Sequence, residues 1–165
     1  MGPPRIAHAA LDLELRDEQA TAALAGRLAA AVRTGDVIAL RGDLGAGKTL
    51  LARAFVNALP GAREEVPSPT FTLAQTYRRG DLEVWHFDLY RLESPEEAYE
   101  LGIEEAFAEA VSLIEWPERL GALLPKERLD LWLEQGAEAQ TRRLRLEGHG
   151  GWAARLAAIF AEPAA

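Results

Sequence analysis

The chain contains no cysteine, which excludes disulfide bonds, zinc sites built from thiolates and cysteine nucleophiles. It also lacks any apolar run of the ~20 residues that a membrane-spanning helix requires. No apolar segment follows residues 1–5, so we expect no signal peptide. These absences predict a cytoplasmic protein with no membrane partner.

Positive charge is also scarce. Lys48 and Lys126 are the only lysines, and 26 acidic residues outnumber 18 basic ones, which gives a net charge of −8. This excess argues against autonomous binding of DNA, RNA or anionic membranes, because a run of phosphates must be neutralised by basic side chains. The composition, 48% hydrophobic and 27% charged, is ordinary for a globular protein. The length predicts a single domain over residues 1–165.

Apolar patterning predicts an α/β fold. Short apolar runs between turn residues are typical of strands in a parallel sheet, and strict alternation is typical of strands with one exposed face. Short polar turns predict two antiparallel hairpins. Strands are expected at residues 11–15, 37–40, 70–77, 82–87, 111–115, 129–133 and 143–147, with turns at 34–36 and 78–81. Helices are expected from the N-cap Asp17 to about Val32, at 48–58 and at 152–160, with two short helices that begin at a capping-box pattern, residues 94–97, and are separated by Gly102.

The strongest motif is a glycine-rich loop between a predicted buried strand and a predicted helix. Residues 42–49 read Gly-Asp-Leu-Gly-Ala-Gly-Lys-Thr and match G-x-x-x-x-G-K-[ST], the phosphate loop of nucleotide hydrolases. Glycines let backbone N–H groups point inward at an anion, and the following helix presents its positive end to the same phosphates. In this pattern Lys48 reaches the β- and γ-phosphates, and the Thr49 hydroxyl binds Mg²⁺. The prediction is a P-loop NTPase-like, three-layer domain with a mixed, partly parallel sheet and antiparallel hairpin additions.

Hydrolysis needs further oxygen ligands for the metal and a group that activates water. Folds of this class place ligands at the carboxyl ends of strands. Asp88 follows the predicted strand residues 84–87, and Glu115 follows residues 111–114. We expect both carboxylates to act with Lys48 in metal binding and catalysis.

Four other residues near these motifs have less specific patterns. Thr70 lies in a Ser-Pro-Thr-Phe-Thr loop and is a candidate switch residue that senses the γ-phosphate or touches Mg²⁺. His86 alternates with aromatic residues and is interpreted as a structural strand residue. Trp116 could cover the site or pack, and we favour packing. Arg91 could contact phosphate or form a surface ion pair, and we favour the ion pair.

Taken together, four segments closely resemble the TsaE (YjeE) family of small bacterial ATPases, which are needed for the threonylcarbamoyladenosine modification of tRNA. The phosphate loop is generic, but the other three segments are specific in this order. They read Ser-Pro-Thr-Phe-Thr-Leu at 68–73, His-Phe-Asp-Leu-Tyr-Arg-Leu at 86–92 and Ile-Glu-Trp-Pro-Glu at 114–118. Their order and spacing match the family from about Asp17 to about Leu146.

The resemblance implies a role for individual residues. Thr49 and Glu115 would bind Mg²⁺, and Asp88 would serve the metal or the attacking water. The nucleotide would be bound by Glu18 near its base, by Arg142 from the last hairpin, and by the loop residues Leu44, Gly45, Ala46, Gly47, Lys48 and Thr49.

The resemblance also implies two partner proteins, TsaD and TsaB. TsaD carries the transferase chemistry on the adenosine beside the anticodon. TsaE hydrolyses ATP to reset the complex between turnovers and does not transfer the group itself. Contact with tRNA would then be indirect, through the complex, which agrees with the net negative charge of the chain.

Three other functions stay open from the residues alone. A GTPase would carry an Asn/Thr-Lys-x-Asp motif, whereas Lys126 lies in Pro-Lys-Glu-Arg. A small-molecule kinase would need an arginine-bearing lid, whereas Arg142, Arg143 and Arg145 follow an alternating strand pattern. A nucleotide-gated binding module with negligible turnover needs the same phosphate cradle as a slow ATPase, so the sequence does not separate the two.

Overall fold

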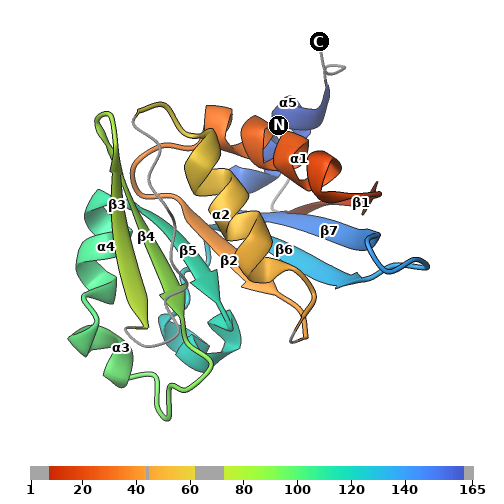
Figure 1. Ribbon diagram of the computed structural model, residues 1–165. Coiled ribbons are helices and arrows are strands. Elements are labelled where there is room, and N and C mark those ends of the chain that lie inside the picture. The colour runs from red at the N-terminus through yellow and green to blue at the C-terminus, as the bar shows by residue number, and fades with distance from the viewer. Residues whose placement is uncertain (1–7, 44, 62–72, 162–165) are drawn as a thin grey trace, which may run out of the picture.

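The computed structural model describes residues 8–43, 45–61 and 73–161, and within them the strands form one mixed sheet. The strands are β1 (His8–Leu15), β2 (Val37–Arg41), β3 (Ala74–Arg79), β4 (Leu82–Asp88), β5 (Val111–Glu115), β6 (Arg128–Gln135) and β7 (Arg142–His149). Their order across the sheet is β1-β7-β6-β2-β5-β4-β3 (Figure 1). The neighbours among β6, β2, β5 and β4 are parallel, and β1, β7 and β3 pair antiparallel at the two sides. The predicted mixed sheet with hairpin additions is confirmed.

Helices cover both faces of this sheet. The longer ones, α1 (Glu18–Ala31), α2 (Lys48–Ala58) and α5 (Gly151–Ala161), share one apolar core with the sheet. The opposite face, at β4 and β5, is covered by α3 (Glu97–Glu100), α4 (Ile103–Glu109) and the 3-10 helix η1 (Pro117–Leu123), which form a second core. Figure 1 shows α2 against the sheet with α1 beside it, and α3 and α4 at the other side. In the described part of the chain, no helix combines the length and apolar character needed to cross a bilayer.

Two helix boundaries follow the sequence signals. The Asp17 carboxylate accepts a hydrogen bond from the Ala20 N–H at 2.9 Å and caps α1 as predicted. Gly102 has a left-handed backbone, with φ of 83°, and separates α3 from α4. A non-glycine residue is strained in this conformation, which explains why the break falls there.

The predicted capping box at residues 94–97 is wrong. The helix begins two residues later, its N-cap residue is Glu96, and no side chain caps it. The N–H groups of Glu97 and Ala98 are satisfied by the carbonyls of Ser94 and Pro95, so a backbone turn replaces the side-chain cap. The Glu97 carboxylate accepts instead from the Glu93 N–H at 3.3 Å.

The first hairpin is tighter and its first strand shorter than predicted. Arg79 pairs with Leu82, so the turn has two residues, Gly80 and Asp81, instead of four. The strand expected over residues 70–77 begins at Ala74, because Leu73 has a positive φ of 61° that interrupts the extended backbone. Residues 70–72 lie outside the described residues.

Candidate functional site

The loop after β2 has a backbone that only glycine adopts without strain at several positions. Gly42, Gly45 and Gly47 have φ values of 141°, 81° and 103°. A Cβ atom on Gly42 would lie 2.4 Å from the Leu133 carbonyl oxygen of β6, closer than packing allows. Gly47 ends the loop as the N-cap of α2, and no side chain caps its first turn. The loop therefore leads to a helix N-terminus whose first N–H groups are available for an anion.

We predict that Gly42→Ala destabilises the protein by about 2–4 kcal/mol, because it combines a clash with β6 and a strained φ. Thermal or urea unfolding measures this loss. The matched control is Gly26→Ala in α1, where an added Cβ meets nothing within 4 Å. That control should stabilise by up to about 1 kcal/mol, since alanine is the better helix former. Equal stability of the two variants would contradict the proposed backbone constraint.

Lys48, the first residue of α2, is buried with its ammonium inside the protein. The Nζ atom donates a hydrogen bond to the Gly42 carbonyl at 2.5 Å and lies 3.6 Å from the centre of the Trp116 ring. Burial lowers the pKa of Lys48 from its ordinary value, and surrounding carboxylates, chiefly Glu115, oppose this shift. A buried cation that bonds a loop carbonyl and faces an aromatic ring is placed to change partners when an anion enters the loop.

A buried carboxylate connects α2 with the centre of the sheet. The Thr49 hydroxyl donates to Glu115 Oε1 at 3.0 Å, and His86 Nε2 lies 2.6 Å from Glu115 Oε2. Glu115 ends β5, and its side chain is only 4% exposed. The two predicted metal ligands, Thr49 and Glu115, are therefore in direct contact.

Asp88 lies beside Glu115 because it ends the neighbouring parallel strand. The two residues are register partners in the β4–β5 pair. Asp88 Oδ1 accepts a hydrogen bond from the Tyr90 N–H at 3.1 Å, which fixes the carboxylate at the strand end. Parallel strands end at the same edge of a sheet, so residues that end neighbouring parallel strands lie side by side. This is why the two carboxylates meet, as the sequence predicts.

These side chains surround a cavity of about 490 Å³ at the end of the phosphate loop. Such a volume lies within the range of small-ligand sites. It is lined by Gly45, Gly47, Lys48, Thr49, Leu50, Leu73, Asp88, Tyr90, Arg91, Glu115, Trp116 and Arg142. The structure thus brings together Lys48, Thr49, Asp88 and Glu115 from three separate segments of the sequence.

Arg142 lines this cavity but is already bonded to backbone. Its Nε donates to the Ala46 carbonyl at 3.0 Å, and its Nη1 donates to the carbonyls of Ala139 and Thr141. The side chain thereby ties the β6–β7 turn to the phosphate loop. Its role toward a nucleotide stays a prediction.

Four other predicted site residues are not brought into the cavity by the described structure. Ala46 is buried and does not line the cavity. Glu18 is exposed at the first turn of α1 and does not line the cavity. Leu44 and Thr70 lie outside the described residues. Arg91 is exposed at the cavity rim, and no ion pair joins it to another described residue, so the expected surface ion pair is not found there.

Sequence reasoning missed the contacts of two residues at this site. Trp116 has a left-handed backbone, with φ of 59° and ψ of 51°, which for a bulky residue is strained. This conformation turns its ring over the Lys48 ammonium and against the Tyr90 ring, 5.0 Å away between centroids. From the sequence, His86 is interpreted as a structural strand residue, whereas the structure places it against Glu115. The signal in the sequence is its spacing of two from Asp88, which puts both side chains on one face of β4.

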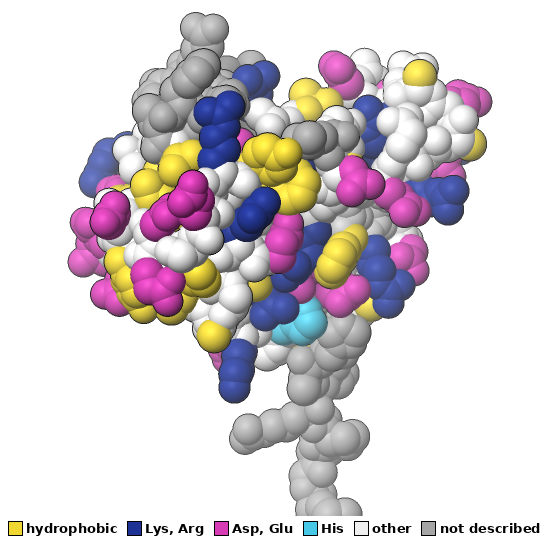
Figure 2. All heavy atoms as spheres, turned by 90° about the horizontal axis from the view of Figure 1, so that it is seen from below, with side chains coloured by type: hydrophobic (Ala, Val, Ile, Leu, Met, Phe, Trp, Pro, Cys, Tyr) yellow, Lys and Arg dark blue, Asp and Glu magenta, His cyan; other side chains and the backbone are white. Residues whose placement is uncertain are grey.

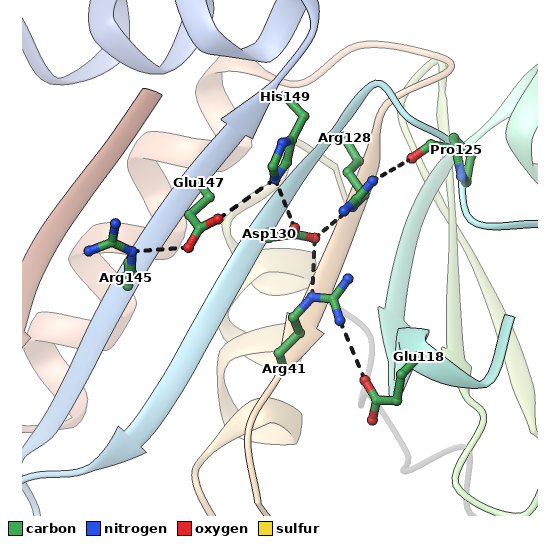
Figure 3. A network of polar contacts seen from close by, with 8 residues as sticks. All are labelled: Arg41, Glu118, Pro125, Arg128, Asp130, Arg145, Glu147 and His149. Carbon is green, nitrogen blue, oxygen red and sulfur yellow. Dashed lines mark hydrogen bonds and ion pairs between the residues drawn. The ribbon is translucent and has the colours of Figure 1, made fainter. Parts of the chain in front are cut away.

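A larger groove of about 980 Å³ lies on the sheet face opposite α1 and α2. Three residues of its lining, Arg41, Glu118 and Arg145, belong to the network of polar contacts around Asp130 that Figure 3 shows. Asp130 accepts from Arg128 Nε at 2.9 Å, lies 3.3 Å from Arg41 Nε and contacts His149 Nε2 at 3.0 Å. Asp130, Glu147 and His149 are close enough to share a cation, but two arginines already neutralise Asp130. We therefore interpret this cluster as a network of ion pairs and not as a metal site.

Charge on the molecular surface is mixed. Figure 2 shows acidic and basic side chains interspersed on the face seen from below, with no continuous basic region among the described residues drawn there.

Comparisons with known proteins identify one family. Residues 15–144 match the family model described as "Threonylcarbamoyl adenosine biosynthesis protein TsaE". The tRNA threonylcarbamoyladenosine biosynthesis protein TsaE of Rickettsia felis is 44% identical over 122 residues, which cover 74% of this chain and 71% of that protein. Its counterpart in Bacillus subtilis is 40% identical over 119 residues, 72% of this chain and 73% of that protein.

A solved structure has the same architecture. The crystal structure of Bacillus subtilis YdiB superimposes with a TM-score of 0.72 at 29% sequence identity and covers 92% of each chain. The segment that matches the family model, residues 15–144, includes the phosphate loop, both strand-end carboxylates and most of the last hairpin. On the family match and the shared fold, this chain belongs to the TsaE family.

Proposed function

We propose that this protein is the Mg²⁺-dependent, ATP-binding and ATP-hydrolysing component of the cytoplasmic machinery that makes threonylcarbamoyladenosine on tRNA. It acts with TsaD and TsaB and supports their turnover, while tRNA is held by the complex. The observation that carries the proposal is the convergence of Lys48, Thr49, Asp88 and Glu115 on one cavity beside the phosphate loop. The named relatives in tRNA threonylcarbamoyladenosine biosynthesis support the pathway.

The residues present fit a magnesium ion and a triphosphate. One hydroxyl and two carboxylates, from Thr49, Asp88 and Glu115, are the hard oxygen donors that Mg²⁺ prefers. The bound metal would neutralise charge that develops on the phosphates. Lys48 and the N–H groups at the start of α2 would bind phosphate oxygens, and the buried carboxylates would orient the attacking water.

A nucleotide-gated module with negligible hydrolysis is the second candidate, and one observation favours it. Two polar groups of the cavity are paired internally: the Lys48 ammonium bonds the Gly42 carbonyl, and the Thr49 hydroxyl bonds Glu115. These hydrogen bonds within the protein must be exchanged for bonds to the nucleotide and the metal before hydrolysis can occur. Slow turnover of the isolated chain is therefore expected under both candidates, and the assembled complex distinguishes them.

The function is tested by phosphate release from ATP with the chain alone, with purified TsaD and TsaB, and with tRNA added. We expect slow release by the chain, faster release in the complex, and loss of release in EDTA. GTP in place of ATP should support less release, and phosphate released should equal ATP consumed, as required when water is the acceptor. Absence of turnover in the complex would favour the gated module. A phosphorylated small molecule in place of free phosphate would indicate a kinase.

A further inference from the structure

His86 is the most deeply buried polar residue next to the cavity. Its side chain is 0% exposed, and Nε2 lies 2.6 Å from Glu115 Oε2. On β4 it occupies the same sheet face as Asp88, since the two residues are separated by one position. Its register partner on β5 is Leu113, so Glu115 is the diagonal neighbour that the imidazole reaches.

The surroundings of the ring determine which nitrogen carries the proton. Nδ1 is buried and has no hydrogen-bond partner among the described residues. A proton on Nδ1 would therefore be an unsatisfied buried donor, and it would leave the Nε2 lone pair facing a carboxylate oxygen. A proton on Nε2 avoids both penalties, because Nε2–H then donates to Glu115 Oε2.

The Glu115 carboxylate is consequently held from two sides. His86 Nε2–H donates a hydrogen bond to Oε2, and the Thr49 hydroxyl donates one to Oε1 at 3.0 Å. Rotation of the carboxylate would break both contacts in a buried site. Oε1 is thus kept beside the Thr49 hydroxyl, where both oxygens are available to one cation, while Oε2 is turned toward the core.

We propose that His86 is a positioning residue, which orients Glu115 through an Nε2–H donor so that Thr49 and Glu115 present their oxygens together. This inference rests on the proposed Mg²⁺–ATP function and adds to it a residue outside the cavity lining. Carboxylates that bind metals are generally oriented by such outer hydrogen bonds, whose removal weakens metal binding by about 10- to 100-fold.

Two substitutions separate hydrogen bonding from packing. His86→Gln keeps an N–H donor at the reach of Nε2, whereas His86→Asn is too short to reach Glu115. Calorimetry measures the affinity for ATP at increasing Mg²⁺ concentrations and in EDTA. The quantity compared is the Mg²⁺ concentration at which the increase in ATP affinity reaches half of its maximum. We expect His86→Asn to raise that concentration about 10- to 100-fold with ATP affinity in EDTA nearly unchanged. His86→Gln should restore most of the loss.

The matched control is His149→Asn, since His149 lies on the opposite sheet face and contacts Asp130 instead of the cavity. It should leave the Mg²⁺ requirement unchanged. Equal behaviour of His86→Asn and wild type would overturn the proposal, as would a His86→Gln variant that is as impaired as His86→Asn.

A second measurement needs neither metal nor nucleotide. The chain has three histidines, so the ¹⁵N resonances of the imidazoles can be assigned by the signal that His86→Gln removes. We expect the His86 proton on Nε2 in the free wild-type protein, and a proton on Nδ1 would overturn the proposal. If the wild type neither binds nor hydrolyses Mg²⁺–ATP, the proposed function fails while the tautomer result still reports on the Glu115 contact.

Discussion

Replacement of Lys48 by alanine is expected to weaken ATP binding by about 100-fold or more, equal to ~2.7 kcal/mol. Lys48 is the cation of the phosphate loop, and its ammonium lies within hydrogen-bond distance of the Gly42 carbonyl at the loop start. A charged donor beside phosphate oxygens contributes more than a neutral one, and this site is shielded from water. Calorimetric titration with ATP and Mg²⁺ measures the loss.

The chain offers a matched control, because Lys126 is the only other lysine and is exposed. Lys126→Ala should bind ATP like the wild type. Unfolding is not the expected cause of the Lys48 effect: burial lowers the pKa of Lys48, so its charged form is disfavoured in the folded protein. Lys48→Met should therefore unfold, without nucleotide, at a temperature no lower than the wild type. Wild-type ATP affinity in Lys48→Ala would remove this residue from the phosphate site.

Replacement of Glu115 by glutamine is expected to reduce ATP hydrolysis by about 100-fold or more and to leave ATP affinity in EDTA nearly unchanged. The amide keeps the size of the carboxylate and can still bond Thr49 and His86, so the local structure should persist. It removes the negative charge that, in the proposed mechanism, would bind the metal and orient water. Single-turnover phosphate release in the complex with TsaD and TsaB measures the chemical step.

Glu118→Gln is the control for charge in the same region. The Glu118 side chain is 49% exposed, lies 3.6 Å from Arg41 and does not line the cavity at the phosphate loop. We expect its rate of hydrolysis to be close to that of the wild type. A Glu115→Gln variant with normal turnover would show that this carboxylate is dispensable and would leave Asp88 as the candidate.

Local chemistry made part of the site predictable. The phosphate loop requires glycines in a fixed pattern between a strand and a helix. At Gly42 the reason is steric, because a Cβ atom there would clash with the Leu133 carbonyl oxygen. Asp88 and Glu115 were found because each ends a strand, and parallel neighbours bring such ends together. Each of these features is determined by a few consecutive residues, so it can be predicted from the sequence without knowledge of distant contacts.

Contacts between distant segments were less predictable. Alternation placed His86 on a face of β4, but only the strand order puts that face beside Glu115 of β5. The orientation of Trp116 depends on a left-handed backbone that nothing in its residue type favours. The capping pattern at residues 94–97 failed for a related reason, since backbone carbonyls competed with the side chains for the same N–H groups.

The Gly42 carbonyl and the Trp116 ring, which both contact the Lys48 ammonium, limit which ligands can bind in the cavity. An incoming anion competes with a carbonyl and an aromatic face inside the protein, and not with water alone. A ligand with many oxygens and its own metal overcomes this competition, whereas a single small anion gains little by it. In the proposed hydrolysis, free phosphate would be such an anion, so we expect the lysine to return to its resting partners and the product to leave.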